Sequence, residues 1–286
     1  MSLPLAHASA KMNPAPHPQR ELPIGIFDSG IGGLTVVRQM HQLLPREDLI
    51  YLGDTARVPY GTKAPTTVIR FACEDTRFLL HQKVKAVVVA CNTVSAWALP
   101  TLEKQFPLPI WGVILSGAQA ALAASKNHRI GVIGTQATVR SRAYERAIVG
   151  LDPLARVYAK ACPLLVPLVE EGWIQHDVTR AVLTEYLAPL LRRNIDTLVL
   201  GCTHYPLLKK LIRQVVGKEV HLVDSAESCA RFVQERLRQL RLLSQRRREG
   251  VIQPFLTDET TQFDPFAKRF LGVPTEPAWR VELSTP

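Results

Sequence analysis

The chain repeats one series of strand-like and helix-like segments at a nearly constant spacing. RIGVIGT (129–135) follows IGIFDS (24–29) by 106 residues, and RVYAKACP (156–163) follows DLIYLGDT (48–55) at a similar distance. DTLVLGCTH (196–204) follows KAVVVACNT (85–93) by 111 residues, so that Cys202 matches Cys91. A constant spacing of such units is the mark of duplication. The repeat therefore predicts two similar domains.

Strand-like and helix-like segments alternate from Pro23 onward, which predicts an α/β fold. We expect two similar domains with mainly parallel, flavodoxin-like sheets and an active site in the cleft between them. The first domain is expected over 22–115 plus 225–272, and the second over 116–224. Four prolines in the first 20 residues predict a disordered N-terminal tail over 1–21, and 273–286 is expected to form a C-terminal tail.

Composition is that of a soluble globular protein. Hydrophobic residues make up 47% of the 286 residues and charged residues 21%, enough to build two cores. No apolar run approaches the roughly 18–20 residues that span a bilayer, and the N-terminus lacks a signal-peptide pattern. The five cysteines are odd in number and form no CxxC pair. We therefore expect free thiols and a cytoplasmic location.

The net charge of +10 is concentrated in one segment. Residues 231–250 hold seven arginines against two glutamates. One interpretation is a surface for an acidic partner such as nucleic acid. The other is an amphipathic helix whose apolar residues face inward, and we favour it because no aromatic residues interleave with the arginines. The inward residues would be Phe232, Val233, Leu237, Leu240 and Leu243.

Cys91 and Cys202 each follow a buried-strand pattern. Ligands of open α/β sheets bind beyond the carboxyl ends of the strands, so two facing domains would bring both thiols to one cleft. Inverting a carbon centre by proton transfer needs a base on one face and an acid on the other. A thiol, with an ordinary pKa of about 8.5, can serve as either. A single cysteine in this position is more often a small buried apolar residue, and we interpret Cys73, Cys162 and Cys229 in that way.

The residues beside the two thiols are polar. His204 can exchange a proton near neutral pH, and Asp28 could hold a substrate ammonium. No lysine stands in these segments to form a Schiff base, no zinc-ligand spacing is complete, and DSGIGG (28–33) is only a weak phosphate-loop signal. The neutral donors suit recognition of a carboxylate, and they are Ser29, Asn92, Thr93, Thr135, Thr138 and Thr203.

Seven motifs in order resemble those of glutamate racemases, cofactor-independent enzymes that interconvert L- and D-glutamate for bacterial cell-wall synthesis. They are IGIFDSGIGGLTV, YLGDTARVPYG, VVACNT, GVIGTQATVRS, ACPLLVPLVEEG, LVLGCTHYP and VDS. The resemblance implies no metal and no cofactor. It implies that Cys91 acts on D-glutamate and Cys202 on L-glutamate, with Asp28, Glu170 and His204 assisting proton transfer. The implied substrate contacts are Asp28, Ser29, Tyr60, Gly61, Asn92, Thr93, Thr203 and His204.

Some features lie outside the family pattern. Ser116, in WGVILSGAQA (111–120), stands where the family usually carries a proline-containing motif, which would alter the hinge between domains. Some relatives from Gram-negative bacteria have a similar N-terminal extension and need a cell-wall precursor as activator. Such a precursor is therefore a candidate partner here, as is a second copy in a homodimer. Two rival functions stay open. One is a racemase for aspartate or another amino acid, and the other is a basic, non-catalytic regulator that binds nucleic acid or a nucleotide.

Overall fold

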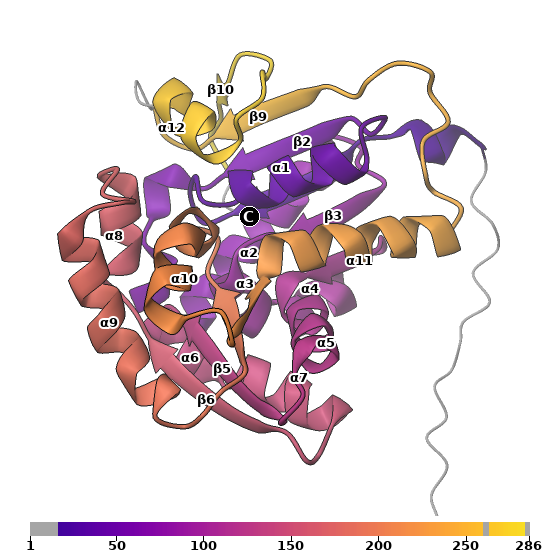
Figure 1. The fold of residues 1–286 in the computed structure, drawn as a ribbon. Coiled ribbons are helices and arrows are strands. Elements are labelled where there is room, and N and C mark those ends of the chain that lie inside the picture. The colour runs from indigo at the N-terminus through magenta and orange to yellow at the C-terminus, as the bar shows by residue number, and fades with distance from the viewer. Residues whose placement is uncertain (1–16, 260–262, 284–286) are drawn as a thin grey trace, which may run out of the picture.

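Two parallel sheets form the framework of the computed structural model, which describes residues 17–259 and 263–283 (Figure 1). The six-stranded sheet has the order β10-β9-β2-β1-β3-β4, and the four-stranded sheet has the order β6-β5-β7-β8. The strands of the larger sheet are β1 (Ile24–Asp28), β2 (Leu49–Gly53), β3 (Ala86–Val89), β4 (Ile110–Gly112), β9 (Ile252–Leu256) and β10 (Trp279–Arg280). Those of the smaller sheet are β5 (Arg129–Gly134), β6 (Arg156–Ala161), β7 (Thr197–Gly201) and β8 (His221–Asp224).

The same strand order occurs in both sheets. In each, the first strand along the chain lies between the second and the third, and the fourth lies beyond the third. This is the order of the first four strands of a flavodoxin-like sheet, and every pairing is parallel. The expectation of an α/β chain with two parallel sheets is confirmed. β4 and β10 are short strands that the sequence pattern did not predict.

The central strands are buried along their whole length because both faces of each sheet are covered. β1, β3 and β7 are buried at every position, as expected for parallel strands with helices on both faces. Helices of the first half are α1 (Leu34–Leu43), α2 (Pro65–His81), α3 (Asn92–Trp97), α4 (Leu99–Gln105) and α5 (Val113–Ala124). The later helices are α6 (Gln136–Ser141), α7 (Ala143–Leu151), α8 (Leu165–Glu170), α9 (Asp177–Leu191), α10 (Lys209–Val216), α11 (Ser225–Gln239) and α12 (Phe263–Phe270). None of the described helices is long and apolar enough to cross a membrane.

A row of helices joins the two sheets. α1 packs on α11, α11 on α5, and α5 on α7, and Figure 1 shows α11 crossing between the upper and lower sheets. The expected boundary between residues 115 and 116 falls inside α5. Ser116 is buried there and its hydroxyl donates to the Val113 carbonyl. The division into domains stays a prediction, with α5 shared between the two sheets.

The arginine-rich segment is helical only in part, so the expected helix over 231–250 is wrong beyond Gln239. Leu240 caps α11 and Arg241 adopts the left-handed conformation (φ 58°). The Leu242 amide donates to the Leu237 carbonyl and the Arg241 amide to the Arg238 carbonyl. This is a Schellman motif, which ends a helix by satisfying its last carbonyls. Beyond it the chain is irregular and leads back to β9.

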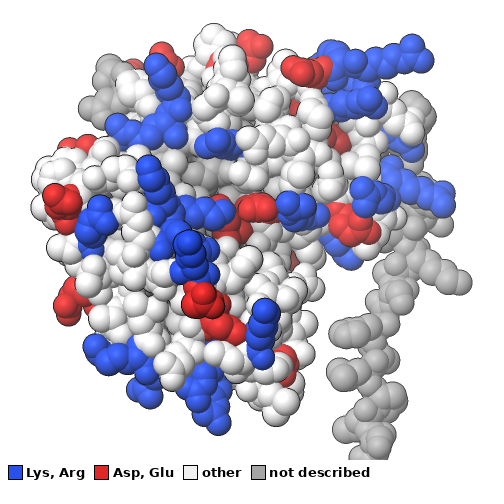
Figure 2. Space-filling view, in the orientation of Figure 1, with Lys and Arg blue, Asp and Glu red and all other residues white. Residues whose placement is uncertain are grey.

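Ion pairs within the chain take up much of the charge of this segment. On α11, Arg231 pairs with Glu227 at 3.0 Å and Arg238 with Glu235 at 2.5 Å. Figure 2 shows acidic and basic side chains interspersed along the line of this helix. Arg246 and Arg248 both bind Asp48, at the start of β2. These contacts support a structural role for the segment and weaken the nucleic-acid interpretation.

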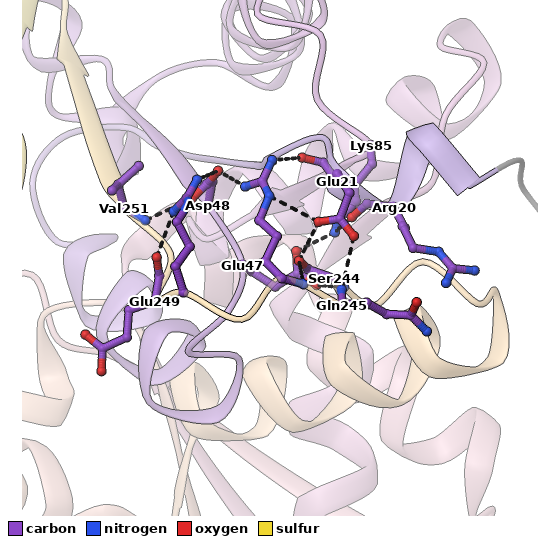
Figure 3. Close-up of polar contacts among 11 residues, drawn as sticks. Arg20, Glu21, Glu47, Asp48, Lys85, Ser244, Gln245, Glu249 and Val251 are labelled. Carbon is purple, nitrogen blue, oxygen red and sulfur yellow. Dashed lines mark hydrogen bonds and ion pairs between the residues drawn. The ribbon is translucent and has the colours of Figure 1, made fainter.

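The N-terminal residues 17–21 meet the same segment. They form a 3-10 helix (His17–Glu21), so the expected disordered tail is wrong for this part, while residues 1–16 lie outside the described residues. The Glu21 carboxylate accepts from the Ser244 hydroxyl at 2.7 Å and pairs with Arg246 at 3.1 Å (Figure 3). In the expected C-terminal tail, β10 pairs with β9 at the edge of the larger sheet.

We expect the buried pair of Glu47 and Lys85 to contribute strongly to stability. Both side chains are almost fully buried, and the Glu47 carboxylate also accepts from the Ser244 amide at 2.8 Å. Glu47→Gln leaves the Lys85 ammonium buried beside a neutral group, which should lower the free energy of unfolding by about 3 kcal/mol. Urea unfolding measures this loss. Glu249→Gln, at an exposed position in the arginine-rich segment, should change the free energy of unfolding by less than about 0.5 kcal/mol. Equal effects of the two variants would contradict the role assigned to the buried pair.

Candidate active site

Cys91 and Cys202 line one cavity of about 390 Å³, a volume within the range of about 300–1,000 Å³ usual for small-molecule sites. Cys91 follows β3 and caps the N-terminus of α3, and Cys202 follows β7. Both thiols stand at the carboxyl ends of equivalent strands of the two sheets. The other residues that line the cavity are Ser29, Gly30, Val58, Pro59, Tyr60, Gly61, Thr62, Asn92, Thr93, Thr135, Gln136, Pro163, Val166, Pro167, Glu170, Thr203 and His204.

The Cys91 thiol has a hydroxyl group and a buried carboxyl group for neighbours. Ser29 Oγ lies 3.4 Å from Cys91 Sγ. Burial, together with the charge of Asp28, raises the pKa of Cys91 to about 12, although the Ser29 hydroxyl and the backbone of α3 act in the opposite direction. Cys91 is therefore a neutral thiol near pH 7, the form that can donate a proton.

The Cys202 thiol has a cationic neighbour. His204 Nδ1 lies 3.9 Å from Cys202 Sγ, and His204 Nε2 lies 2.9 Å from Glu170 Oε1. Burial lowers the pKa of His204, but hydrogen bonds with Cys202 and Glu170 outweigh it and raise this pKa to about 10. His204 is therefore an imidazolium near pH 7. Its positive charge beside Cys202 suits a thiolate base on this side of the cavity.

Hydroxyl and amide groups from both halves of the chain meet at the cavity wall. Thr93 Oγ1 lies 2.9 Å from Thr135 Oγ1 and 3.3 Å from Thr138 Oγ1. Asn92 Oδ1 accepts from the Tyr144 hydroxyl at 2.7 Å, while its Nδ2 is buried without an acceptor among the described residues. A buried donor without an acceptor is costly unless a ligand supplies one. Donors of this kind can bind a carboxylate.

Two of the predicted site residues direct their polar groups away from the cavity. Asp28 does not line it, because its carboxylate accepts from the Gly30 amide at 3.1 Å and the Thr203 hydroxyl at 3.5 Å. Burial raises the pKa of Asp28, against the opposing charge of His204. Tyr60 lines the cavity, but its hydroxyl donates to Asp54. Gly61 lies beside Thr135, with space for little more than hydrogen: a Cβ there would lie 3.0 Å from the Thr135 Cβ.

The turn after β1 lies directly against the segment that follows Cys202. A Cβ on Gly32 would lie 2.4 Å from Thr203 Oγ1 and 2.5 Å from the His204 ring, so only glycine fits. Thr35 Oγ1 donates to the Thr203 carbonyl at 2.9 Å. The glycine-rich DSGIGG segment thus serves close approach of the two halves of the chain rather than phosphate binding.

Sequence reasoning missed the apolar wall of the cavity. Val58 and Pro59 come from the loop after β2, and Pro163, Val166 and Pro167 from the loop and helix after β6. These two loops follow equivalent strands, so the repeat was a signal that could have identified them. Among the residues that line this cavity there is no lysine or arginine. The described chain also holds no group of three or more histidine, cysteine, aspartate or glutamate side chains placed to bind a metal.

Comparisons with known proteins find one family of enzymes. The family model described as Asp/Glu/Hydantoin racemase matches residues 24–233. A glutamate racemase of Syntrophus aciditrophicus is 49% identical over 261 residues, which cover 91% of this chain and 97% of that protein. The glutamate racemase isoform RacE1 of Bacillus anthracis superimposes with a TM-score of 0.89 at 38% identity, covering 92% of this chain and 98% of that one.

Two solved neighbours contain ligands. The glutamate racemase of Francisella tularensis, in complex with D-glutamate, has a TM-score of 0.85 at 38% identity and covers 92% of this chain and 98% of that one. The Escherichia coli glutamate racemase, in complex with L-glutamate and the activator UDP-MurNAc-Ala, has a TM-score of 0.73 at 28% identity, covering 92% and 100%. The chain therefore belongs to the Asp/Glu/Hydantoin racemase family, in which its relatives at about 50% identity are glutamate racemases, which are isomerases.

Proposed function

We propose that this enzyme interconverts L- and D-glutamate by a two-base mechanism in which Cys91 and Cys202 serve opposite faces of the α-carbon. The observation that carries the proposal is the arrangement of the two thiols, which stand at equivalent strand ends and line one cavity. Proton transfer to and from a carbon centre needs groups that can both give and take a proton near neutral pH, and thiols can do so.

In the direction from L-glutamate, the Cys202 thiolate takes the α-proton and becomes a thiol. The electron pair left on the α-carbon takes a proton from the Cys91 thiol on the opposite face, and Cys91 becomes a thiolate. The reverse reaction exchanges these roles. The environments support this assignment, since Cys91 is a neutral thiol and the His204 imidazolium lies beside Cys202.

Neutral donors are proposed to hold the substrate carboxylates. The Asn92 amide, which lacks an acceptor, and the hydroxyls of Thr93 and Thr135 line the cavity. These two hydroxyls lie 2.9 Å apart and hydrogen-bond to one another. A bound carboxylate can accept from all three groups, and hydrogen bonds to a charged acceptor are about twice as strong as neutral ones. Ser29, Tyr60, Gly61 and Thr203 complete the proposed contacts, with Asp28 supporting Thr203 from behind.

The relatives support glutamate, rather than aspartate, as the proposed substrate. D-glutamate is bound in the Francisella tularensis enzyme and L-glutamate in that of Escherichia coli. We propose further that the product supplies cell-wall synthesis in the cytoplasm. The five cysteines are free thiols, as expected in a reducing compartment. Because the Escherichia coli enzyme binds an activator, UDP-MurNAc-Ala is a candidate activator here as well.

Replacing either proposed base should remove activity without unfolding the protein. Cys91→Ala and Cys202→Ala should each lower kcat/KM for both enantiomers by roughly 10²–10⁴-fold, the usual contribution of one acid or base. Polarimetry with each enantiomer measures the rates. Cys73→Ala is the control, because Cys73 lies outside the cavity and contacts Gln105. A Cys91 or Cys202 variant as active as this control would disprove the two-base mechanism.

The charge on His204 should make stability depend on pH. Its pKa rises from 6.5 to about 10 in the folded chain, so the stabilisation is complete below about pH 6.5 and is lost as the pH rises through about 10. The free energy of unfolding should therefore fall over this interval, and less steeply in His204→Asn. Urea unfolding at a series of pH values tests this, with His221→Asn, at the exposed start of β8, as control. Equal slopes in wild type and His204→Asn would contradict the charge assigned to His204.

A further inference from the structure

Helix α12 reaches from the larger sheet to the Cys202 side of the cavity. It follows β9 along the chain and packs on α1. At its end, Phe270 is fully buried, and its ring stands almost perpendicular to the His204 imidazole, with 5.4 Å between the ring centres. Edge-to-face contact of this kind is favourable for aromatic rings. One side of the His204 ring is therefore defined by α12.

Arg269, the residue before Phe270 on α12, binds the backbone of Glu170, the second hydrogen-bond partner of His204. Arg269 Nη1 donates to the Glu170 carbonyl at 2.7 Å and to the Val169 carbonyl at 3.2 Å. Val169 and Glu170 are the last two residues of α8. Carbonyls in the last turn of a helix lack partners within the helix and carry partial negative charge, so a guanidinium is well suited to them.

The Glu170 side chain has little else to hold it. It is 42% exposed, and its carboxylate forms a hydrogen bond of 2.9 Å with His204. The chain turns immediately afterwards at Gly172, whose φ is +80°, and the Arg269 guanidinium lies against this glycine. Arg269 therefore contacts the backbone of α8 and of the turn that follows it.

We propose that Arg269 is a positioning residue for the reaction: by holding the end of α8, it keeps the Glu170 carboxylate within hydrogen-bonding distance of His204 beside Cys202. The proposal rests on the proposed function of Cys202 as a base. It assigns a role to a residue that touches neither the cavity nor the thiols. It also explains how a helix of the larger sheet supports the reacting group of the smaller one.

A purely structural role for Arg269 predicts something different. If the guanidinium only attached α12, its loss would lower stability and leave the pH dependence of catalysis unchanged. If it acts through Glu170, its loss should weaken the hydrogen bond that supports the imidazolium. The alkaline limb of the profile of kcat/KM against pH should then move to lower pH, as it should in Glu170→Gln.

The test compares Arg269→Met, Glu170→Gln, the double variant and Lys268→Met in the full chain. Lys268 is the matched control, being an exposed cation one residue away on α12. Arg269→Met should lower kcat/KM about tenfold, the effect expected from weakening one hydrogen bond to a charged group. The double variant should be no slower than Glu170→Gln alone, because both changes remove one interaction. Lys268→Met should match the wild type.

Two results would overturn the proposal. One is an Arg269→Met enzyme with the rate and pH profile of Lys268→Met, and the other is a double variant whose loss is the product of the two single losses. If Arg269→Met does not fold, Arg269→Lys is measured in the same way, and its loss must likewise disappear in the Glu170→Gln background. Full activity of the Cys91→Ala or Cys202→Ala variant would contradict the proposed function itself. If both thiols are essential but Arg269→Met has the rate of the wild type, only the role of Arg269 is contradicted.

Discussion

The structure depends on the close approach of two strand-end loops, one from each sheet. The turn after β1 lies so near the segment after β7 that a Cβ on Gly32 would overlap Thr203 and His204. Thr35 and Asp28 bind Thr203 across the same contact. Because the strands of each sheet are parallel, all functional groups at their carboxyl ends face this junction. That contact brings together the strand ends that carry the two thiols and the polar groups of the cavity.

Equivalent positions carry unequal surroundings. Cys91 has a hydroxyl and a buried carboxyl nearby, while Cys202 has an imidazolium that Glu170 supports. The two enantiomers have equal free energy, so kcat/KM must be the same in both directions whatever the surroundings of the thiols. The asymmetry can therefore affect only kcat and KM separately, together with the protonation state in which the two thiols rest. In this structure that state has Cys91 protonated.

Sequence repetition predicted the parts of the fold that depend on regular burial. The two parallel sheets and the placing of Cys91 and Cys202 at equivalent strand ends follow from apolar runs and their spacing. Features set by contacts between distant residues were not predictable. A left-handed residue other than glycine was not predictable either: the helix that begins at Ser225 ends at Gln239 because Arg241 turns the chain. Residues 17–21 are ordered against Ser244 and Arg246, and Asp28 turns from the cavity to Thr203. No local pattern encodes these partners.

The central claim is that different thiols serve the two faces of the substrate. The most direct test is to follow the α-hydrogen in heavy water, starting from unlabelled L-glutamate and stopping at low conversion. The account predicts that the D-glutamate formed carries deuterium at the α-carbon, because its new proton comes from Cys91, whereas the remaining L-glutamate stays unlabelled. D-glutamate that retained the original hydrogen would show that one group carries the proton between the two faces, and would contradict the account.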